Sequence, residues 1–161
     1  MGIKVLHCAD LHLDAVLGGS VRAGQNEYID EQKNILLRDA PLLALKNVAD
    51  VAVIENVDLV LIAGDLFNSK EDAAMNHRVR AQLLNFFKTL DGANIKICIA
   101  VGNHDPLKYI KEISASWPDN VYLFKNKSVE TFLFEINNQS VAVHGVSYAT
   151  QHEDRDLAST F

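Results

Sequence analysis

Three short polar motifs hold the residue types that are best suited to chemistry in this chain. They are Asp-x-His at residues 10–12, Gly-Asp at residues 64–65 and Gly-Asn-His-Asp at residues 102–105. Carboxylate oxygen, imidazole nitrogen and amide oxygen form a mixed ligand set that suits Mn²⁺, Fe²⁺ or Zn²⁺ in a hydrolytic site. The two cysteines, Cys8 and Cys98, fit no zinc or redox spacing. The motifs therefore predict a hydrolytic metal centre rather than a Cys-rich structural zinc site.

The spacing within the motifs supports this interpretation. Side chains two residues apart in an extended segment point to the same face, so Asp10 and His12 can bind one ion together. The Asp65 carboxylate is suited to bridge two ions, which lie ~3.5–4 Å apart in two-metal sites. Asn103 can offer its amide oxygen to the second ion. His104 follows directly and is expected to act on a phosphate group instead of on a metal.

Each motif taken alone has a simpler interpretation. An Asp after a buried strand is often a helix N-cap or a turn residue, and this reading of Asp65 is as good as the functional one. Asp-x-His arises by chance, and Gly-Asn-His-Asp can be a polar turn. The set favours a metal site because each motif follows its own apolar segment, and Gly64 and Gly102 allow a sharp backbone turn just before a ligand.

The elements that must position these motifs can be read from the apolar pattern. Unbroken apolar runs predict buried strands, and apolar residues at three- and four-residue steps predict helices. The predicted strands of this part cover residues 3–8, 58–63 and 95–101, and the predicted helices cover 27–56, 72–90 and a short segment after Pro106. Residues 14–24 are predicted as a loop, and Pro41 should kink the first helix or divide it in two.

The last third of the chain is richer in strands. Short strands are predicted at residues 121–124, 129–136 and 140–146, with Asn137-Asn138 as a hairpin turn. The order β–α–β–α–β before them predicts an α/β fold with a parallel-containing sheet that is covered on both faces, in which ligands bind at the carboxyl ends of the strands. We expect one domain over residues 1–161, made of an αβ half to about 118, a strand-rich segment at about 119–148 and an exposed tail at 149–161.

Composition narrows the class of protein. The 161 residues are 48% hydrophobic and 22% charged, which is an ordinary globular composition and excludes a disordered chain. A net charge of −6 excludes a generic basic nucleic-acid coat protein, but not a nucleic-acid enzyme, because a metal site needs carboxylates. No apolar run reaches ~18 residues, so no membrane span is expected. Without a signal peptide, a cytoplasmic location is predicted.

The strings ADLHLD, GDLF and GNHD resemble the calcineurin-like metallophosphoesterase superfamily, and within it most resemble the DNA-repair exonuclease branch, the SbcD-like nucleases. HGVSY at residues 144–148 resembles a strand-end motif that these nucleases carry after GNHD. The resemblance spans about residues 3–148. It implies a four-layer α-β-β-α arrangement in which a β-sheet sandwich is flanked by helices.

The resemblance also implies roles for the motif residues. Asp10 and His12 would bind the first metal, Asp65 would bridge both metals, and Asn103 would bind the second. Two divalent ions are implied, with Mn²⁺ expected and Fe²⁺, Zn²⁺ or Mg²⁺ as alternatives. His104 would be the catalytic histidine that stabilises or protonates the leaving oxygen.

Three further residues are candidates near the site. Asp105 is counted with His104 in the catalytic pair, as a residue that orients His104. Asp14 is either a residue that supports the first metal or a loop cap. His144 is a candidate substitute ligand, although the resemblance places it within HGVSY.

Two features depart from the family pattern. The family completes its site with a later histidine and a Gly-His-x-His motif, and neither occurs before the chain ends in ATQHEDRDLASTF. We therefore expect a C-terminally truncated, N-terminal portion that binds metal weakly and has little activity alone. In addition, Asn68 stands where related nucleases often carry a histidine.

The predicted function is metal-dependent phosphodiester hydrolysis, as a DNA exonuclease or endonuclease in DNA repair. The resemblance implies an SbcC-like ATPase as partner and a homodimer as the form. Two alternatives stay open, namely a phosphoesterase for a small molecule or a protein, and an inactive metal-binding or interaction fragment.

Four lysines give the region after GNHD a local positive charge: Lys108, Lys111, Lys125 and Lys127. This charge is either ordinary surface charge or a feature that steers DNA toward the metal site. His7, Cys8 and Cys98 are expected to serve in packing.

Overall fold

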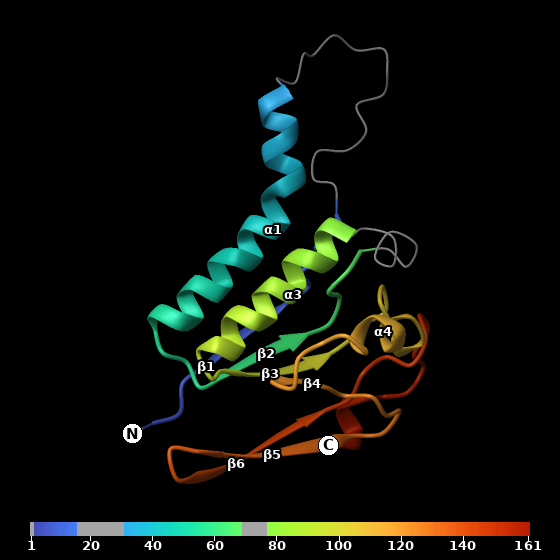
Figure 1. The fold of residues 1–161 in the computed structure, drawn as a ribbon. Helices are drawn as coiled ribbons and strands as arrows, with labels where there is room; N and C mark the ends of the chain where they lie inside the picture. The colour runs from blue at the N-terminus through green and yellow to red at the C-terminus, as the bar shows by residue number, and fades with distance from the viewer. Residues whose placement is uncertain (1, 16–30, 69–76) are drawn as a thin grey trace.

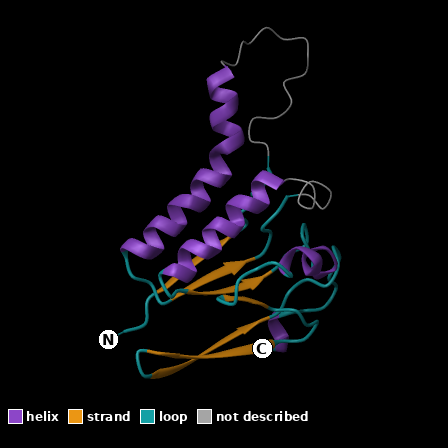
Figure 2. Cartoon of the chain, in the orientation of Figure 1, coloured by secondary structure: helices purple, strands orange, loops and turns teal. Residues whose placement is uncertain are grey.

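The computed structural model describes residues 2–15, 31–68 and 77–161. Its elements are β1 (Val5–Ala9), α1 (Glu31–Ile54), β2 (Leu59–Ala63), α3 (His77–Gly92), β3 (Lys96–Ala100), α4 (Leu107–Ser114), β4 (Val121–Leu123), β5 (Glu130–Ile136), β6 (Gln139–Gly145) and a 3₁₀ turn (Ala158–Thr160) (Figures 1 and 2). The predicted order of strands and helices is confirmed for these residues. Most of the loop predicted at residues 14–24, and the first residues of the helices predicted from 27 and 72, lie outside the described residues.

Four strands form a parallel sheet in the order β1-β2-β3-β4. Since crossovers between parallel strands are right-handed, strands added in one direction place their connecting helices on one face. Figure 1 shows α1 and α3 together on that face and the antiparallel pair β5–β6 on the other. Both faces are covered, as predicted, but the second is covered by a hairpin. The α/β fold is therefore confirmed, with helix, sheet and hairpin layers in the described part of the chain.

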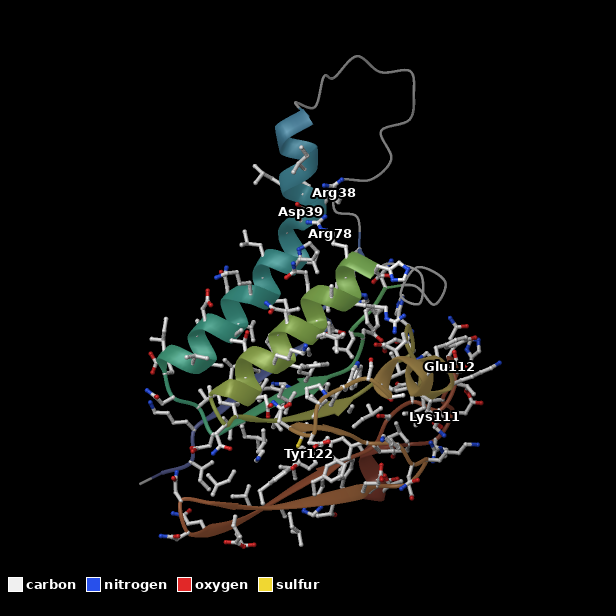
Figure 3. The ribbon with its side chains drawn as sticks, in the orientation of Figure 1. Arg38, Asp39, Arg78, Lys111, Glu112 and Tyr122 are labelled. Carbon is white, nitrogen blue, oxygen red and sulfur yellow. The ribbon has the colours of Figure 1, made fainter. Side chains whose placement is uncertain are left out.

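Alternation along the strands divides the apolar residues between two cores. Val60 and Ile62 point to the helices and belong to a large cluster that also contains Phe87 of α3. Leu59 of β2 and Cys98 of β3 point to the hairpin and join a smaller cluster with Phe124 and Phe134. Tyr122 packs in this second layer, with its ring centroid 4.8 Å from that of Phe134 (Figure 3). Full burial of such side chains stabilises the fold by roughly 1.5–3 kcal/mol each.

Strand β1 is less buried than its sequence predicts. Among the described strands it lies at the edge of the sheet and pairs only with β2, and Val5 is 48% exposed. The prediction of a buried strand here is wrong, because apolar runs do not reveal which strand takes the edge. His7 is exposed instead of packed, whereas Cys98 is buried as predicted and Cys8 is half-buried.

Helix α1 continues through Pro41, so this residue kinks the helix and does not divide it. The bend lies close to Arg38 and Asp39 (Figure 3), where Asp39 accepts a 2.8 Å hydrogen bond from Arg78 of α3. Hydrogen bonds from Arg78 and Arg38 lower the pKa of Asp39 to about 2. Of the apolar stripe predicted for this helix, the part after Pro41 is buried, with Leu45 at 2% exposure, whereas Leu36 is 66% exposed.

The C-terminal hairpin follows the prediction closely. Strands β5 and β6 pair from Glu130↔Gly145 to Ile136↔Gln139. The turn residues Asn137 and Asn138 have φ of 52° and 59°, as a two-residue type I′ turn requires. The residues after 148 are largely exposed. No helix among the described residues has the length and apolar character that a membrane span needs.

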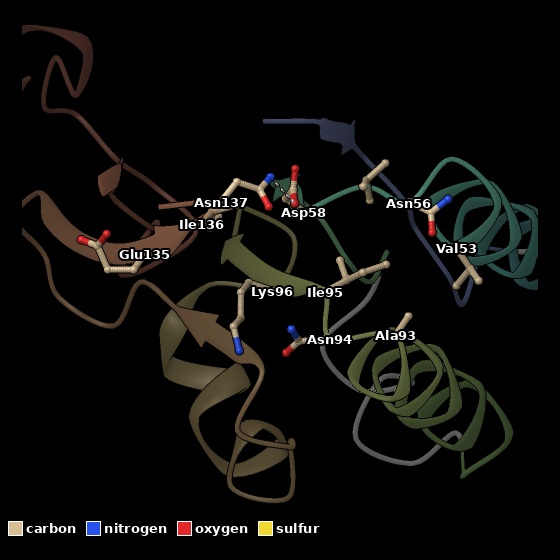
Figure 4. Close-up of a pocket in the computed structure, with 11 residues that line it drawn as sticks. Val53, Asn56, Asp58, Ala93, Asn94, Ile95, Lys96, Glu135, Ile136 and Asn137 are labelled. Carbon is tan, nitrogen blue, oxygen red and sulfur yellow. Dashed lines mark hydrogen bonds between the residues drawn. The ribbon is translucent and has the colours of Figure 1, made fainter. Parts of the chain in front are cut away.

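A cavity of about 400 Å³ lies at the amino ends of β2 and β3 (Figure 4). Asp58 and Asn137 line it and are joined by a 3.2 Å hydrogen bond, and Lys96 and Asn94 extend into the same region. The three polar motifs follow the carboxyl ends of strands. The cavity therefore lies at the opposite edge of the sheet from the candidate chemistry.

Candidate metal centre

Strands β1, β2 and β3 end at the same level of the sheet. Ala9 pairs with Ala63, and Ala63 pairs with Ala100, so the last residues of the three strands form one row. Each polar motif begins one to two residues after this row. The parallel arrangement thus delivers the motif side chains to one edge, as expected for ligand sites in open α/β sheets.

Asp10, His12 and Asp65 come together at this edge. One ligand atom from each lies within 4.8 Å of the other two, and His12 Nε2 is 3.9 Å from Asp65 Oδ2. Metal–oxygen and metal–nitrogen bonds of ~2.0–2.2 Å place two ligand atoms of one ion ~3–4 Å apart, so the cluster is close to the spacing that a cation needs. His12 Nδ1 is buried and has no hydrogen-bond partner among the described residues. The donor set of two carboxylates and one imidazole fits a divalent cation, with Nε2 as the His12 nitrogen that faces Asp65.

The backbone at all three of these residues is strained. The φ angles are 53° at Asp10, 41° at His12 and 40° at Asp65, in the left-handed region that residues other than glycine rarely adopt. Such conformations cost about 1–3 kcal/mol each and persist only where surrounding structure holds them. Here the loops hold one another, since the His12 N–H donates to Asp65 O at 3.0 Å and the Leu13 N–H donates to Leu66 O at 2.8 Å.

Gly102 makes room for the Asp65 carboxylate. A Cβ atom on Gly102 would lie 2.1 Å from Asp65 Oδ1, which is far inside van der Waals contact. The same oxygen accepts a 3.0 Å hydrogen bond from the His104 N–H. Gly64 serves the turn, with φ of 82°, as predicted. Gly102 acts through close approach, which sequence reasoning did not anticipate.

Asp105 joins the second and third motifs through the backbone. It is 2% exposed, and its Oδ1 accepts from the Gly102 N–H at 3.0 Å. Its Oδ2 accepts from the N–H groups of Leu66 and Phe67 at 2.8 and 3.3 Å. Burial raises the pKa of Asp105 to about 7, against the opposing effect of these hydrogen bonds. The role implied by the resemblance was to orient His104, but the hydrogen bonds of Asp105 hold the loop backbone.

His104 lies beside the cluster without belonging to it. Its ring centroid is 5.1 Å from that of His12, with the rings nearly perpendicular. His104 Nδ1 is 2.8 Å from the backbone oxygen of Asn68. The N–H of Asn68 in turn donates to Asp14 Oδ1. Asn103, between Gly102 and His104, is exposed at the same edge.

The sequence model of the calcineurin-like phosphoesterase family matches residues 3–159. The chain belongs to this family. The resemblance drawn from ADLHLD, GDLF and GNHD is therefore confirmed at the level of the family. A calcineurin-like phosphoesterase uses a divalent metal, and the cluster of Asp10, His12 and Asp65 provides a candidate place for one.

Curated relatives of this phosphoesterase include one protein that is named as a DNA repair protein and one that is named as a nuclease subunit. It is 30% identical over 149 residues to the uncharacterized metallophosphoesterase YhaO of Bacillus subtilis, covering 91% of this chain and 34% of that protein. It is 28% identical over 154 residues to the DNA double-strand break repair protein Mre11 of Methanocaldococcus jannaschii, covering 94% and 36%. It is 21% identical over 160 residues to the SbcD component of the SbcCD nuclease of Bacillus subtilis, covering 98% and 37%. The chain spans about a third of the length of these relatives.

The HGVSY segment of this phosphoesterase supports the site without supplying a ligand to the cluster. Its His144 is exposed and bonds Thr131 Oγ1 at 2.8 Å. Val141 and Val143 face the sheet, so His144, one residue on, faces away from it. The alternation of apolar and polar residues along this strand would have been enough to predict from the sequence that His144 faces away from the sheet. Ser147 of the same segment is fully buried and accepts from the Val101 N–H at 3.0 Å, just before the third motif. The sequence marked this residue as part of HGVSY but gave no sign of its contact with Val101.

Proposed function

We propose that this chain carries the N-terminal part of a metal-dependent phosphodiesterase site that acts on DNA. The observation that carries the proposal is the convergence of Asp10, His12 and Asp65 at one sheet edge, with the His104 ring beside them. Asn103 is the additional ligand that we propose for a second ion. A divalent ion, with Mn²⁺ expected and Fe²⁺, Zn²⁺ or Mg²⁺ as alternatives, supplies charge that polarises a phosphoryl oxygen and activates water.

His104 is the residue that we assign to proton transfer. Its Nδ1 is engaged by the Asn68 carbonyl, so Nε2 is the nitrogen that is open to a leaving oxygen or a water molecule. The His104 N–H also fixes Asp65 Oδ1, which links the proton-transfer residue to the metal cluster. General acid–base groups of this kind contribute about 10²–10⁴-fold to rate.

Charge at the same edge supports a nucleic-acid substrate. Four exposed lysines follow the third motif or strand β4 and have no ion-pair partner within 4 Å in the described ranges: Lys108, Lys111, Lys125 and Lys127. Of these, Lys127 is near enough to Glu153 to add to the effect of Arg155 on the pKa of that carboxyl. Figure 3 shows Lys111 on the side of the molecule to which the strands point. This local positive charge contrasts with the net charge of −6 and suits a phosphate backbone. The names of two relatives, one a DNA double-strand break repair protein and one a subunit of the SbcCD nuclease, support DNA ends as the substrate and an SbcC-like ATPase as a partner. A homodimer is proposed on the family resemblance alone.

The test is hydrolysis by the purified chain with Mn²⁺, using labelled duplex DNA and a nitrophenyl phosphodiester in parallel. Because little activity is expected of this chain alone, slow Mn²⁺-dependent loss of duplex ends is the expected result, with His104→Ala slower still by about 10²–10⁴-fold at unchanged Mn²⁺ affinity. His144→Ala is the matched control and should behave as the unmodified chain.

Other outcomes would change the proposal. Hydrolysis of the small diester without DNA cleavage would favour a small-molecule phosphoesterase. A folded chain that hydrolyses neither substrate with any divalent ion would favour a metal-binding or interaction fragment. Loss of Mn²⁺ binding in His104→Ala would make His104 a ligand and contradict its assignment.

A further inference from the structure

The backbone of Asn68 is held from two sides, by residues that follow two different strands. Its N–H donates to Oδ1 of Asp14, which belongs to the loop after β1. Its carbonyl oxygen lies 2.8 Å from Nδ1 of His104, which belongs to the loop after β3. Asn68 itself follows β2. All three motif loops therefore meet at one residue.

The contact with Asn68 determines where the His104 ring carries its proton. A backbone carbonyl has no hydrogen to donate, so the bond forms only when Nδ1 is protonated. In the neutral ring, Nε2 is then an acceptor, and in the charged ring it is a donor. This is the arrangement that a group needs if it exchanges a proton with a phosphoester through Nε2.

Two carboxylates hold the segment that presents this carbonyl. Three consecutive N–H groups, those of Leu66, Phe67 and Asn68, donate to carboxylate oxygens. Asp105 receives the first two from the buried side, and Asp14 receives the third. Hydrogen bonds from N–H groups to a charged acceptor are stronger than neutral ones. The position of the Asn68 carbonyl therefore depends on Asp14 more directly than on any other side chain described at the site.

We propose that Asp14 is a positioning residue that acts through the backbone of Asn68 to keep His104 in the Nδ1-protonated form. The use of that form in phosphoester hydrolysis rests on the proposed function. This role differs from the two considered for Asp14 from sequence, since it serves the histidine and not the first metal. It also makes the Asn68 side chain dispensable for His104, because the acceptor is a main-chain oxygen.

The test is the ¹⁵N spectrum of histidine-labelled full chain, without metal and at a pH where the ring is neutral, with His104→Ala used to assign the signal among the six histidines. The unmodified chain should show His104 protonated at Nδ1. Asp14→Ala should shift His104 toward a mixture of both forms. Asp14→Asn keeps an oxygen acceptor and Asn68→Ala keeps the main chain, so both should retain the original signal. With Mn²⁺ and substrate, Asp14→Ala should lower kcat by about 10–100-fold with little change in KM.

Several results would overturn the inference. One is a His104 ring protonated at Nε2 in the unmodified chain, and another is a folded Asp14→Ala variant with the original signal. If Asp14→Ala does not fold, the signal of the unmodified chain decides, and a ring protonated at Nε2 counts against the role. A chain that shows the Asp14→Ala shift but hydrolyses no phosphodiester would support the positioning role and contradict the proposed function.

Discussion

At the scale of single residues, the site depends on the candidate ligands and equally on the glycine that leaves room for one of them. Gly102 is this glycine, because Asp65 Oδ1 occupies the place where any other residue would put its Cβ. The carboxylate can reach His12 and the His104 N–H only while that place is free. Gly102 of the third motif therefore helps to determine where the Asp65 carboxylate of the second motif lies.

Gly102→Ala should displace the Asp65 carboxylate. We expect a loss of about 1–3 kcal/mol of unfolding free energy from overpacking, together with weaker Mn²⁺ binding. Urea unfolding and calorimetric titration measure the two effects. Gly92→Ala is the matched control, since a Cβ there meets nothing within 4 Å, and it should change neither. Unaltered Mn²⁺ affinity in Gly102→Ala would show that Asp65 is not a ligand.

Asp105 gives the metal-free protein a distinctive pH dependence. Burial raises its pKa from 3.8 to about 7, so between these values the folded chain holds a proton that the unfolded chain has lost. Stability from this group is thus present at low pH and is lost as the pH rises from about 4 to about 7. Unfolding free energies across this range should fall more steeply in the unmodified chain than in Asp105→Asn. If the unfolding free energies of the two proteins changed with pH in parallel, the raised pKa of Asp105 would be ruled out.

At the scale of elements, the parts that sequence could predict are those encoded locally. Apolar runs predicted the strands, and the motif after each run predicted which edge carries the site. The Asn137-Asn138 pair predicted the hairpin. The exposure of Val5 at the sheet edge could not be predicted, because edge position depends on which strands pair. The contacts of Asp105 with Leu66 and Phe67, and of His104 with the Asn68 carbonyl, join residues far apart in sequence through main-chain atoms, which leave no trace in residue type.

The hairpin turn offers a test at this scale. Asn138 has φ of 59°, which glycine adopts freely and a β-branched residue adopts at a cost of about 1–2 kcal/mol. Asn138→Gly should therefore leave the thermal midpoint unchanged or raise it, and Asn138→Val should lower it. Leu133→Val, at an exposed position inside the extended strand β5, is the matched control and should have little effect. Equal loss from both valine substitutions would contradict the turn assignment.

At the scale of the whole molecule, charge is unevenly distributed. The chain is acidic overall, with 21 Asp and Glu against 15 Lys and Arg. Yet the loop after β4 presents Lys125 and Lys127, neither of which has an ion-pair partner within 4 Å in the described chain. Lys127 still feels Glu153, since its charge adds to that of Arg155 in lowering the pKa of that carboxyl. The backbone of the loop is held by Glu130, which accepts from the N–H groups of Lys125 and Asn126. This carboxylate thus shapes the loop while the lysine side chains extend into solvent.

Replacing both Lys125 and Lys127 by Ala should weaken binding to duplex DNA. The slope of log affinity against log salt should become shallower by about 1–2, since each phosphate contact contributes ~0.9. Hydrolysis of the small diester should not change. Replacing Lys4 and Lys46 removes the same charge from lysines paired with Glu55 and Asp50, and should leave DNA binding largely intact. Equal weakening in both double variants would indicate a net-charge effect only.

The hydrogen bonds between the motif loops have a consequence for local unfolding. The loop after β1 is bonded to the loop after β2 through His12 and Leu13, and that loop is bonded to the next through Asp105 and the His104 N–H. No one of these loops can open without breaking bonds to another, although each lies at a surface edge. The edge should therefore fluctuate as one cooperative unit. Its amides would exchange with solvent at a shared, slow rate, as those of a strand do, instead of at the independent rates of three surface loops.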